Sequence, residues 1–180
     1  MELNRPCLVV GIDPGNTGAI AFLGKDGSVK CVNDMPSIKV SKTGACRPDH
    51  HALIEMFREI KELETIDCVY IEEPQKVPSM MGSNSQANYL AGYYKCLFIL
   101  IFHSLSIKHE WIQPKEWQKY WKIKKSKRAD TKMLSERAVS AMFPNIDVRG
   151  PRGGLKDGRC DALLIAEFGR RRYYGSITQT

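Results

Sequence analysis

The sequence lacks the long hydrophobic runs and paired cysteines that mark membrane proteins and disulfide-rich proteins. Its most apolar stretch, CLFILIF at 96–102, is much shorter than the ~20 residues that a membrane-spanning helix needs. The six cysteines stand singly, with no C-x-x-C pair and no histidine at zinc-finger spacing. The N-terminal MELNRPCL has neither the apolar core of a signal peptide nor an Arg- and Ser-rich amphipathic stretch. We therefore expect a reduced intracellular protein without a membrane anchor or a structural zinc.

Acidic residues are outnumbered by basic ones, and the excess is unevenly spread. The 180 residues carry a formal net charge of +7, and their length and 43% hydrophobic content suit one domain with a single core. Much of the positive charge lies in KEWQKYWKIKKSKRADTK at 115–132 and in RGPRGGLKDGR at 149–159. Clustered basic residues favour a nucleic-acid partner more than the total charge does.

The order of hydrophobic patterns predicts an α/β domain. Strands are expected at 7–12, 17–23, 29–35, 68–72 and 107–112. Helices are expected from Asp49 through Leu63, at 83–105, after Pro114, at 130–142 and at 157–172. The polar segment 36–48 predicts a loop. The second half of the helix at 83–105 is apolar nearly all round, so we expect it to be covered on several sides.

Four carboxylates follow or begin these apolar segments. Asp13 ends the first strand, Glu72 or Glu73 ends the strand at 68–72, and Asp157 and Asp161 lie one turn apart on the last helix. A carboxylate at the end of a core strand is costly to desolvate unless a partner or a metal neutralises it. If the two strands are neighbours, three acidic elements converge, and such hard oxygen ligands suit Mg²⁺ or Mn²⁺.

Each carboxylate also has a simpler interpretation. Asp13 with Pro14 and Gly15 could form only a turn, and Glu72 could end a strand in solvent. Asp157 could be no more than the N-cap of the last helix. Asp161 is harder to explain structurally, because ALLIA follows it on the expected buried side.

The motifs VVGIDPGNTGAI, VYIE and DGRCDALLIA, in this order along almost the whole chain, resemble those of the RuvC-type Holliday junction resolvases of bacteria, phages and organelles. The resemblance implies an RNase H-like fold, with a mixed central sheet flanked by helices on both faces, forming a single RuvC-like nuclease domain over 1–180. It also implies an intracellular enzyme that acts on DNA in recombination and repair.

The resemblance further implies a catalytic metal centre. Asp13, Glu72, Asp157 and Asp161 would hold two Mg²⁺ ions about 4 Å apart for phosphodiester hydrolysis, with Mn²⁺ as a substitute. A lysine in the helix before the Gly-rich segment would add positive charge near the cleaved phosphate. Lys132 is the first candidate for this role and Lys127 is the second. The chain departs from the bacterial pattern in one respect, because its last two aspartates are four residues apart and Gly158 stands where that pattern has an acid.

The remaining implications concern partners. Basic residues in the two positively charged segments would contact the phosphates of four-way junction DNA. Two methionines lie in a different segment, which the family inserts into the centre of the junction. These residues are Lys124, Lys125, Lys127, Arg128, Arg149, Arg152, Met80 and Met81. Packing in a core or interface is the ordinary role of such methionines. Paired cutting would need a homodimer, which the helix at 83–105 would form.

Three rival functions stay open at this stage. An actin-like or sugar-kinase ATPase shares the D-x-G-x-x-G pattern, but such proteins place two domains around the nucleotide. Another RNase H-like nuclease could act on flaps or RNA–DNA hybrids. A non-catalytic DNA-binding module is disfavoured by the intact set of acidic residues.

Overall fold

The computed structural model describes residues 5–40, 46–74, 85–123 and 128–175. Within these residues, a mixed five-stranded sheet has the order β3-β2-β1-β6-β7. Its strands are β1 (Cys7–Asp13), β2 (Ala19–Gly24), β3 (Val29–Asp34), β6 (Thr65–Glu72) and β7 (His109–Ile112). β1 pairs antiparallel with β2 and parallel with β6, and β7 extends the parallel part. The predicted strands are therefore present, with small shifts at their ends.

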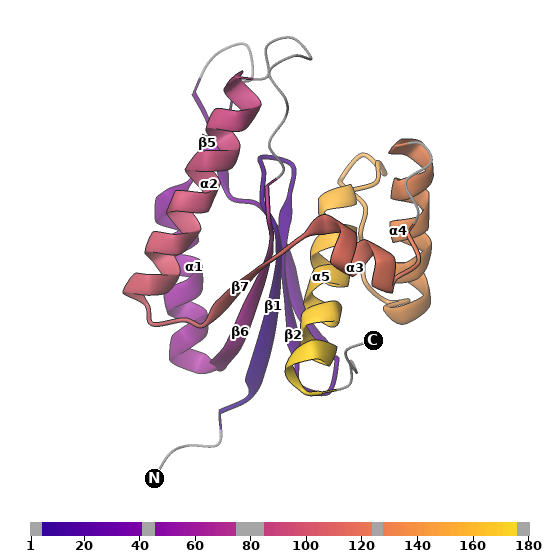
Figure 1. Cartoon of the computed structure of the whole chain (residues 1–180), viewed down its shortest axis with the longest axis horizontal. Helices are drawn as coiled ribbons and strands as arrows, with labels where there is room; N and C mark the ends of the chain where they lie inside the picture. Colours follow the sequence, from indigo (N-terminus) through magenta and orange to yellow (C-terminus); the bar gives the residue numbers. More distant parts are fainter. Residues whose placement is uncertain (1–4, 41–45, 75–84, 124–127, 176–180) are drawn as a thin grey trace.

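Helices cover both faces of this sheet (Figure 1). One face packs against α1 (His50–Leu63) and α2 (Ser85–Ser104), and the other packs against α5 (Asp157–Tyr173). The shorter α3 (Pro114–Tyr120) and α4 (Arg128–Met142) lie outside α5. Because both faces are covered, β1 and β2 consist of nearly continuous buried residues and do not alternate with polar ones. The expected mixed sheet between two helical layers is confirmed.

The α1 and α2 layer is closed by aromatic contacts. The Asp49 side chain accepts a hydrogen bond from the Ala52 backbone N–H at 3.0 Å and so caps α1. Phe57 of α1 meets the ring of Phe102 of α2 edge to face, with centroids 4.9 Å apart, and lies 6.0 Å from the ring of Phe22 in β2. These buried rings lock both helices to the sheet.

The close approach of α5 to β1 depends on Gly11. A Cβ atom at Gly11 would lie 2.2 Å from the Ala166 backbone nitrogen and 2.3 Å from the Ala162 carbonyl oxygen. Only a glycine permits this contact. It brings the helix backbone against the strand two residues before Asp13, so α5 can present its first turns to the end of β1.

One expectation is wrong in part. Segment 36–48 contains a small antiparallel pair, β4 (Ser37–Lys39) and β5 (Cys46–Pro48), because strands of three residues are too short to produce a recognisable period. The helix after Asp49 ends at Leu63 as expected, and Leu63 itself is 74% exposed.

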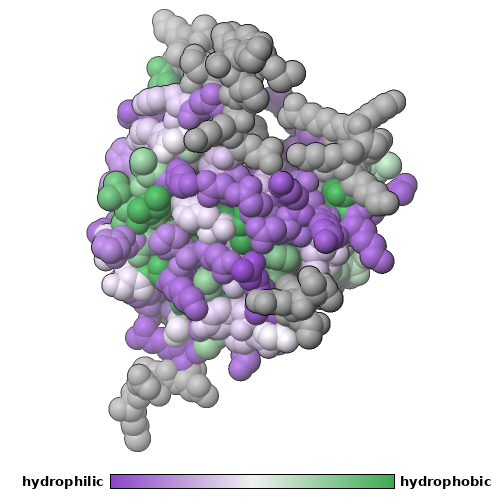
Figure 2. All heavy atoms as spheres, viewed as in Figure 1, coloured by the Kyte–Doolittle hydropathy of each residue, from purple (hydrophilic) through white to green (hydrophobic). Residues whose placement is uncertain are grey.

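The surface of α2 also differs from the expectation. Phe98 and Ile101 are buried against the sheet, but Leu100 is 68% exposed and Tyr89 is 67% exposed. In Figure 2 the apolar patch on the left lies over this helix, while hydrophilic side chains cover much of the rest of that face. Within the described residues, one side of α2 is therefore apolar and uncovered. No helix of this part of the chain is long and apolar enough to cross a membrane.

Candidate active site

The parallel pairing of β1 with β6 places Asp13 and Glu72 side by side. The last paired residues are Ile12 and Ile71, and each carboxylate is the next residue of its strand. Ile12 and Ile71 both pack on the α1 and α2 side. Because successive side chains of a strand point to opposite faces, Asp13 and Glu72 both point toward α5.

Glu72 and Glu73 take different partners. The Glu73 carboxylate forms an ion pair with Lys95 of α2, and the Lys95 ammonium lies 5.2 Å from the centre of the Trp111 ring. Glu72 instead accepts a hydrogen bond from the indole N–H of Trp117, with Oε2 2.7 Å from Nε1. The structure thus places Glu72 on the α5 face and ties Glu73 to α2.

The first turns of α5 bring the other two aspartates to the same end of the sheet. Lys156 is the N-cap residue of this helix and Asp157 is its first residue, so the interpretation of Asp157 as the N-cap is wrong. The Lys132 ammonium of α4 lies 2.6 Å from Asp157 Oδ2. The predicted lysine therefore forms an ion pair with one of the four carboxylates.

Gly158 accounts for the unusual spacing of these aspartates. A Cβ atom there would lie 2.4 Å from the Thr17 carbonyl oxygen and 2.7 Å from the Gly18 Cα atom. The loop between β1 and β2 thus packs directly on the helix backbone, and no side chain fits at this position. The acid that the bacterial pattern has at this position is therefore excluded here, and Asp157 is the acidic residue next to it.

The carboxylates interact strongly with one another. Burial, together with the negative charges of Asp161, Glu72 and Asp157, raises the pKa of Asp13 well above its usual range. Burial also raises the pKa of Asp161 to about 7; the Ser135 hydroxyl opposes this shift, and the charges of Glu72 and Asp157 add to it. At neutral pH, the cluster therefore favours binding of protons or cations.

Ser135 contributes a buried hydroxyl beside Asp161. Its side chain is 1% exposed, and its Oγ atom makes no hydrogen bond of standard geometry within the described residues. The hydroxyl nevertheless lies close enough to the Asp161 carboxylate to lower the pKa of that group as a hydrogen-bond donor.

The donor set fits a hard divalent cation. Asp13, Glu72, Asp157 and Asp161 supply only oxygen atoms, which Mg²⁺ and Mn²⁺ prefer. Within the described residues, no three acidic, histidine or cysteine side chains are already drawn together as a metal-binding group. Glu72 contacts Trp117 and Asp157 contacts Lys132, so the carboxylates share an end of the sheet without forming a closed cage.

The predicted DNA contacts lie only partly within the described residues. Arg149 forms an ion pair with Glu136 and donates to the Gly153 carbonyl oxygen at 3.3 Å, so it supports its own loop. Arg152 is exposed in the same loop, just before α5. Arg128 begins α4, but its side chain is outside the described set. The other predicted contacts also lie outside the described residues: Met80, Met81, Lys124, Lys125 and Lys127.

Two neighbours of the carboxylates were not anticipated from sequence. Trp117 lies in the short segment KEWQKYW at 115–121. Nothing in the sequence distinguishes it from the other two tryptophans, Trp111 and Trp121. Its contact with Glu72 depends on the pairing of β6 with β7, which sets Glu72 beside Ile112 just before α3 begins. Ser135 carries no distinguishing sequence signal, because a serine in a helix is usually exposed.

Comparisons with known proteins bear on the fold. No family model matches the chain, and no curated protein matches it in sequence. Solved structures do: RuvC of Thermus thermophilus, alone and in complex with a Holliday junction substrate, superposes with TM-scores of 0.59 and 0.57 at 14% identity, covering 94% of this chain and 95% of that one. The yeast mitochondrial Holliday junction resolvase Ydc2 superposes with a TM-score of 0.58 at 14% identity, covering 94% of this chain and 80% of that one. The chain therefore has the RNase H-like fold of the RuvC-type Holliday junction resolvases.

Proposed function

We propose that this chain is a divalent-metal-dependent endonuclease that resolves four-way DNA junctions. The observation that carries the proposal is the convergence of Asp13, Glu72 and Asp161 from two strand ends and one helix, where burial and neighbouring negative charges raise the pKa values of Asp13 and Asp161. Groups perturbed in this way gather at functional sites. The motifs at these positions and the fold shared with two junction resolvases support junction cleavage as the specific activity.

The four carboxylates would hold two Mg²⁺ ions, or Mn²⁺ in their place. When bound, such ions activate a water and stabilise the leaving oxygen of a phosphodiester. Asp13 is central, because its pKa responds to the charges of all three other carboxylates. Lys132, held 2.6 Å from Asp157, would place a positive charge at the entrance to the site and favour the approach of a phosphate.

DNA would approach over the end of the sheet where the carboxylates lie. Arg152 is exposed in the loop before α5, and this loop leads into the end of α5 that carries Asp157 and Asp161 (Figure 1). We propose that Arg152 contacts a phosphate directly, whereas Arg149, paired with Glu136, holds the loop in shape. Lys124, Lys125, Lys127 and Arg128, and the methionines at 80 and 81, remain proposed contacts from sequence.

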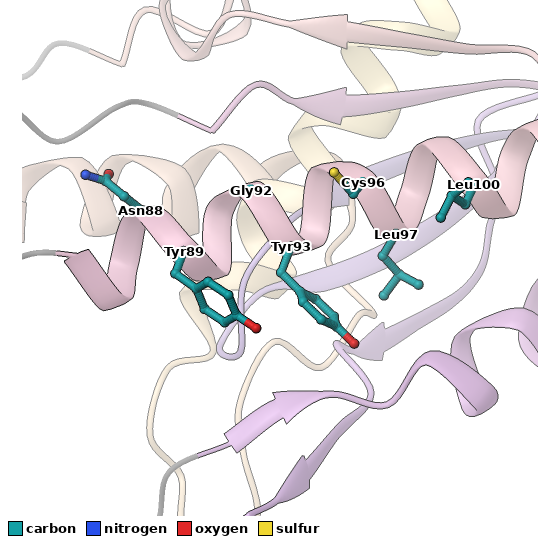
Figure 3. A pocket seen from close by; sticks show the side chains of 7 residues that line it. All are labelled: Asn88, Tyr89, Gly92, Tyr93, Cys96, Leu97 and Leu100. Atoms are coloured by element: carbon teal, nitrogen blue, oxygen red, sulfur yellow. The ribbon is translucent and has the colours of Figure 1, made fainter.

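A homodimer through α2 would supply the second active site. Tyr89, Tyr93 and Leu97 project from one side of this helix (Figure 3) and, with other α2 residues, line a hollow of about 560 Å³. Among the described residues, those that line it all belong to α2, so the hollow is a surface feature and not a closed cavity. A two-fold copy of the same helix would cover this apolar face and set two sites at a fixed separation.

The proposal is tested by comparing substrates. A mobile four-way junction should be cut with Mg²⁺ much faster than matched duplex, flap and RNA–DNA hybrid substrates, and EDTA should stop the reaction. Equal cutting of all four substrates would refute junction specificity, and saturable ATP binding without cleavage would favour the ATPase alternative.

A further inference from the structure

Trp117 is held against the carboxylate end of the sheet by the chain immediately before it. Glu72 in β6 is paired with Ile112, the last residue of β7, and α3 begins two residues later at Pro114. The Gln113 backbone N–H donates to Glu116 Oε1 at 3.1 Å, which fixes the first turn of α3. The residue after Glu116 is Trp117, which is 1% exposed. Its indole packs within the core between the sheet and α5.

The indole meets the site through a single polar atom. Trp117 Nε1 lies 2.7 Å from Glu72 Oε2, which is a short distance for an N–H donor and is typical of a bond to a charged acceptor. Indole N–H is a donor only and carries no charge. It can therefore orient a carboxylate without neutralising it, whereas a lysine or arginine in this place would compete with a cation.

We propose that Trp117 is a positioning residue for the metal centre, holding the Glu72 carboxylate in the orientation that binds the divalent cation. The inference rests on the proposed function, because it assigns Trp117 to the same site. A carboxylate has about four lone-pair positions, so Glu72 can keep the indole hydrogen bond while it binds a metal. Hydrogen-bond donors often orient the side chains that ligate a metal. Removing such a donor commonly weakens metal binding by about 10- to 100-fold.

The chain offers a matched control for this hydrogen bond. Trp121, four residues further on, also makes one indole hydrogen bond, from Nε1 to the Leu164 carbonyl oxygen at 3.0 Å. That bond joins the end of α3 to α5 and involves no carboxylate. Trp117→Phe and Trp121→Phe therefore each remove one indole N–H from the same core, and only the first removes a contact with the acidic site.

The first experiment measures Mn²⁺ binding to wild type and both variants, by counting unbound Mn²⁺ with electron paramagnetic resonance. We expect Trp117→Phe to weaken binding by about 10- to 100-fold and Trp121→Phe to leave it within about twofold of wild type. Excess Mn²⁺ should restore junction cleavage by Trp117→Phe, because the defect lies in metal affinity. Equal Mn²⁺ affinity of the two variants would overturn the proposal.

A second measurement needs no variant to fold. The protein has three tryptophans, so ¹⁵N-indole labelling gives three signals, and Mg²⁺ can be titrated into the wild type without DNA. We expect the Trp117 indole proton to shift on Mg²⁺ binding and to stay protected from exchange, while the Trp121 signal stays in place. If Mg²⁺ binds and junctions are cut but the Trp117 signal does not move, this inference fails alone. If the wild type neither binds Mg²⁺ nor cuts junctions, the proposed function fails with it.

Discussion

Asp161→Asn should stabilise the metal-free protein at neutral and alkaline pH. The folded structure raises the pKa of Asp161 from 3.8 to about 7, so ionising this group costs more in the folded state than in the unfolded state. One pKa unit corresponds to about 1.4 kcal/mol, which gives an upper limit of about 4 kcal/mol above pH 7. Asparagine has nearly the same shape and carries no such cost, so the variant should gain part of this free energy.

The sign of the pH dependence follows from proton uptake. Between about pH 4 and pH 7 the folded protein binds a proton at Asp161 that the unfolded protein has lost, so the free energy of unfolding falls as pH rises. The advantage of Asp161→Asn should therefore be absent near pH 4, grow through this window and level off above pH 7. Urea denaturation in EDTA, at intervals from pH 4.5 to pH 8.5, measures it.

Asp34→Asn is a control of opposite sign. Burial alone would raise the pKa of Asp34, but hydrogen bonds from Arg159 and Lys156 hold it below its usual value. That substitution should destabilise the protein at pH 7, and because the pKa of Asp34 lies below 3.8, the loss should stay nearly constant over this pH range and shrink only in more acidic solution. A constant difference between Asp161→Asn and wild type at every pH, or a less stable variant at pH 8, would refute the electrostatic description of the site.

Three further substitutions, two of them with a matched control, test the catalytic glutamate, the packing at Gly158 and the dimer. Glu72→Gln should abolish cleavage but not junction binding. Glu73→Gln, which removes only the ion pair with α2, should keep cleavage within about tenfold of wild type. Reversed effects would contradict the assignment of Glu72 to the metal site. Gly158→Asp, which restores the bacterial spacing, should destabilise the fold by several kcal/mol in a denaturation experiment, because its side chain overlaps the β1–β2 loop; an unaffected midpoint would exclude the overlap. Leu100→Asp should yield monomers in sedimentation, whereas Leu63→Asp, equally exposed on α1, should not; a monomeric wild type would exclude the α2 dimer.

Much of this fold is encoded locally and could be predicted. The runs that became β1 and β6 are apolar and rich in β-branched residues, and the helix after Asp49 combines a clear period with a capping residue. Asp13 and Glu72 were selected in the same way, because a charge that ends an apolar strand stands out, and Asp161 was selected because an apolar run follows it. Glu72 was preferred to Glu73 because it directly follows the apolar run, where the resemblance places the glutamate, and the structure gives the two residues different partners, Trp117 for Glu72 and Lys95 for Glu73.

What could not be predicted depends on register and close packing. The contact of Trp117 with Glu72 exists because β7 pairs with β6 in one register, which no local pattern specifies. Gly158 looked like a lost acid, yet it is required by the loop that packs on it. The sequence of α2 is typical of a buried helix, yet one side of it is exposed in the single chain. Composition alone does not say whether such a side packs against the same chain or against a second copy.

A supercoiled plasmid with an extruded cruciform gives the most direct test of the proposal as a whole. Two metal sites held at a fixed separation by a dimer should cut both strands within one binding event, so linear DNA should form with Mg²⁺ while nicked circles stay at low levels throughout. The matched plasmid without the cruciform should remain supercoiled. Accumulation of nicked circles as the main product, or equal cutting of the plasmid that lacks the cruciform, would contradict the account of a dimeric junction resolvase.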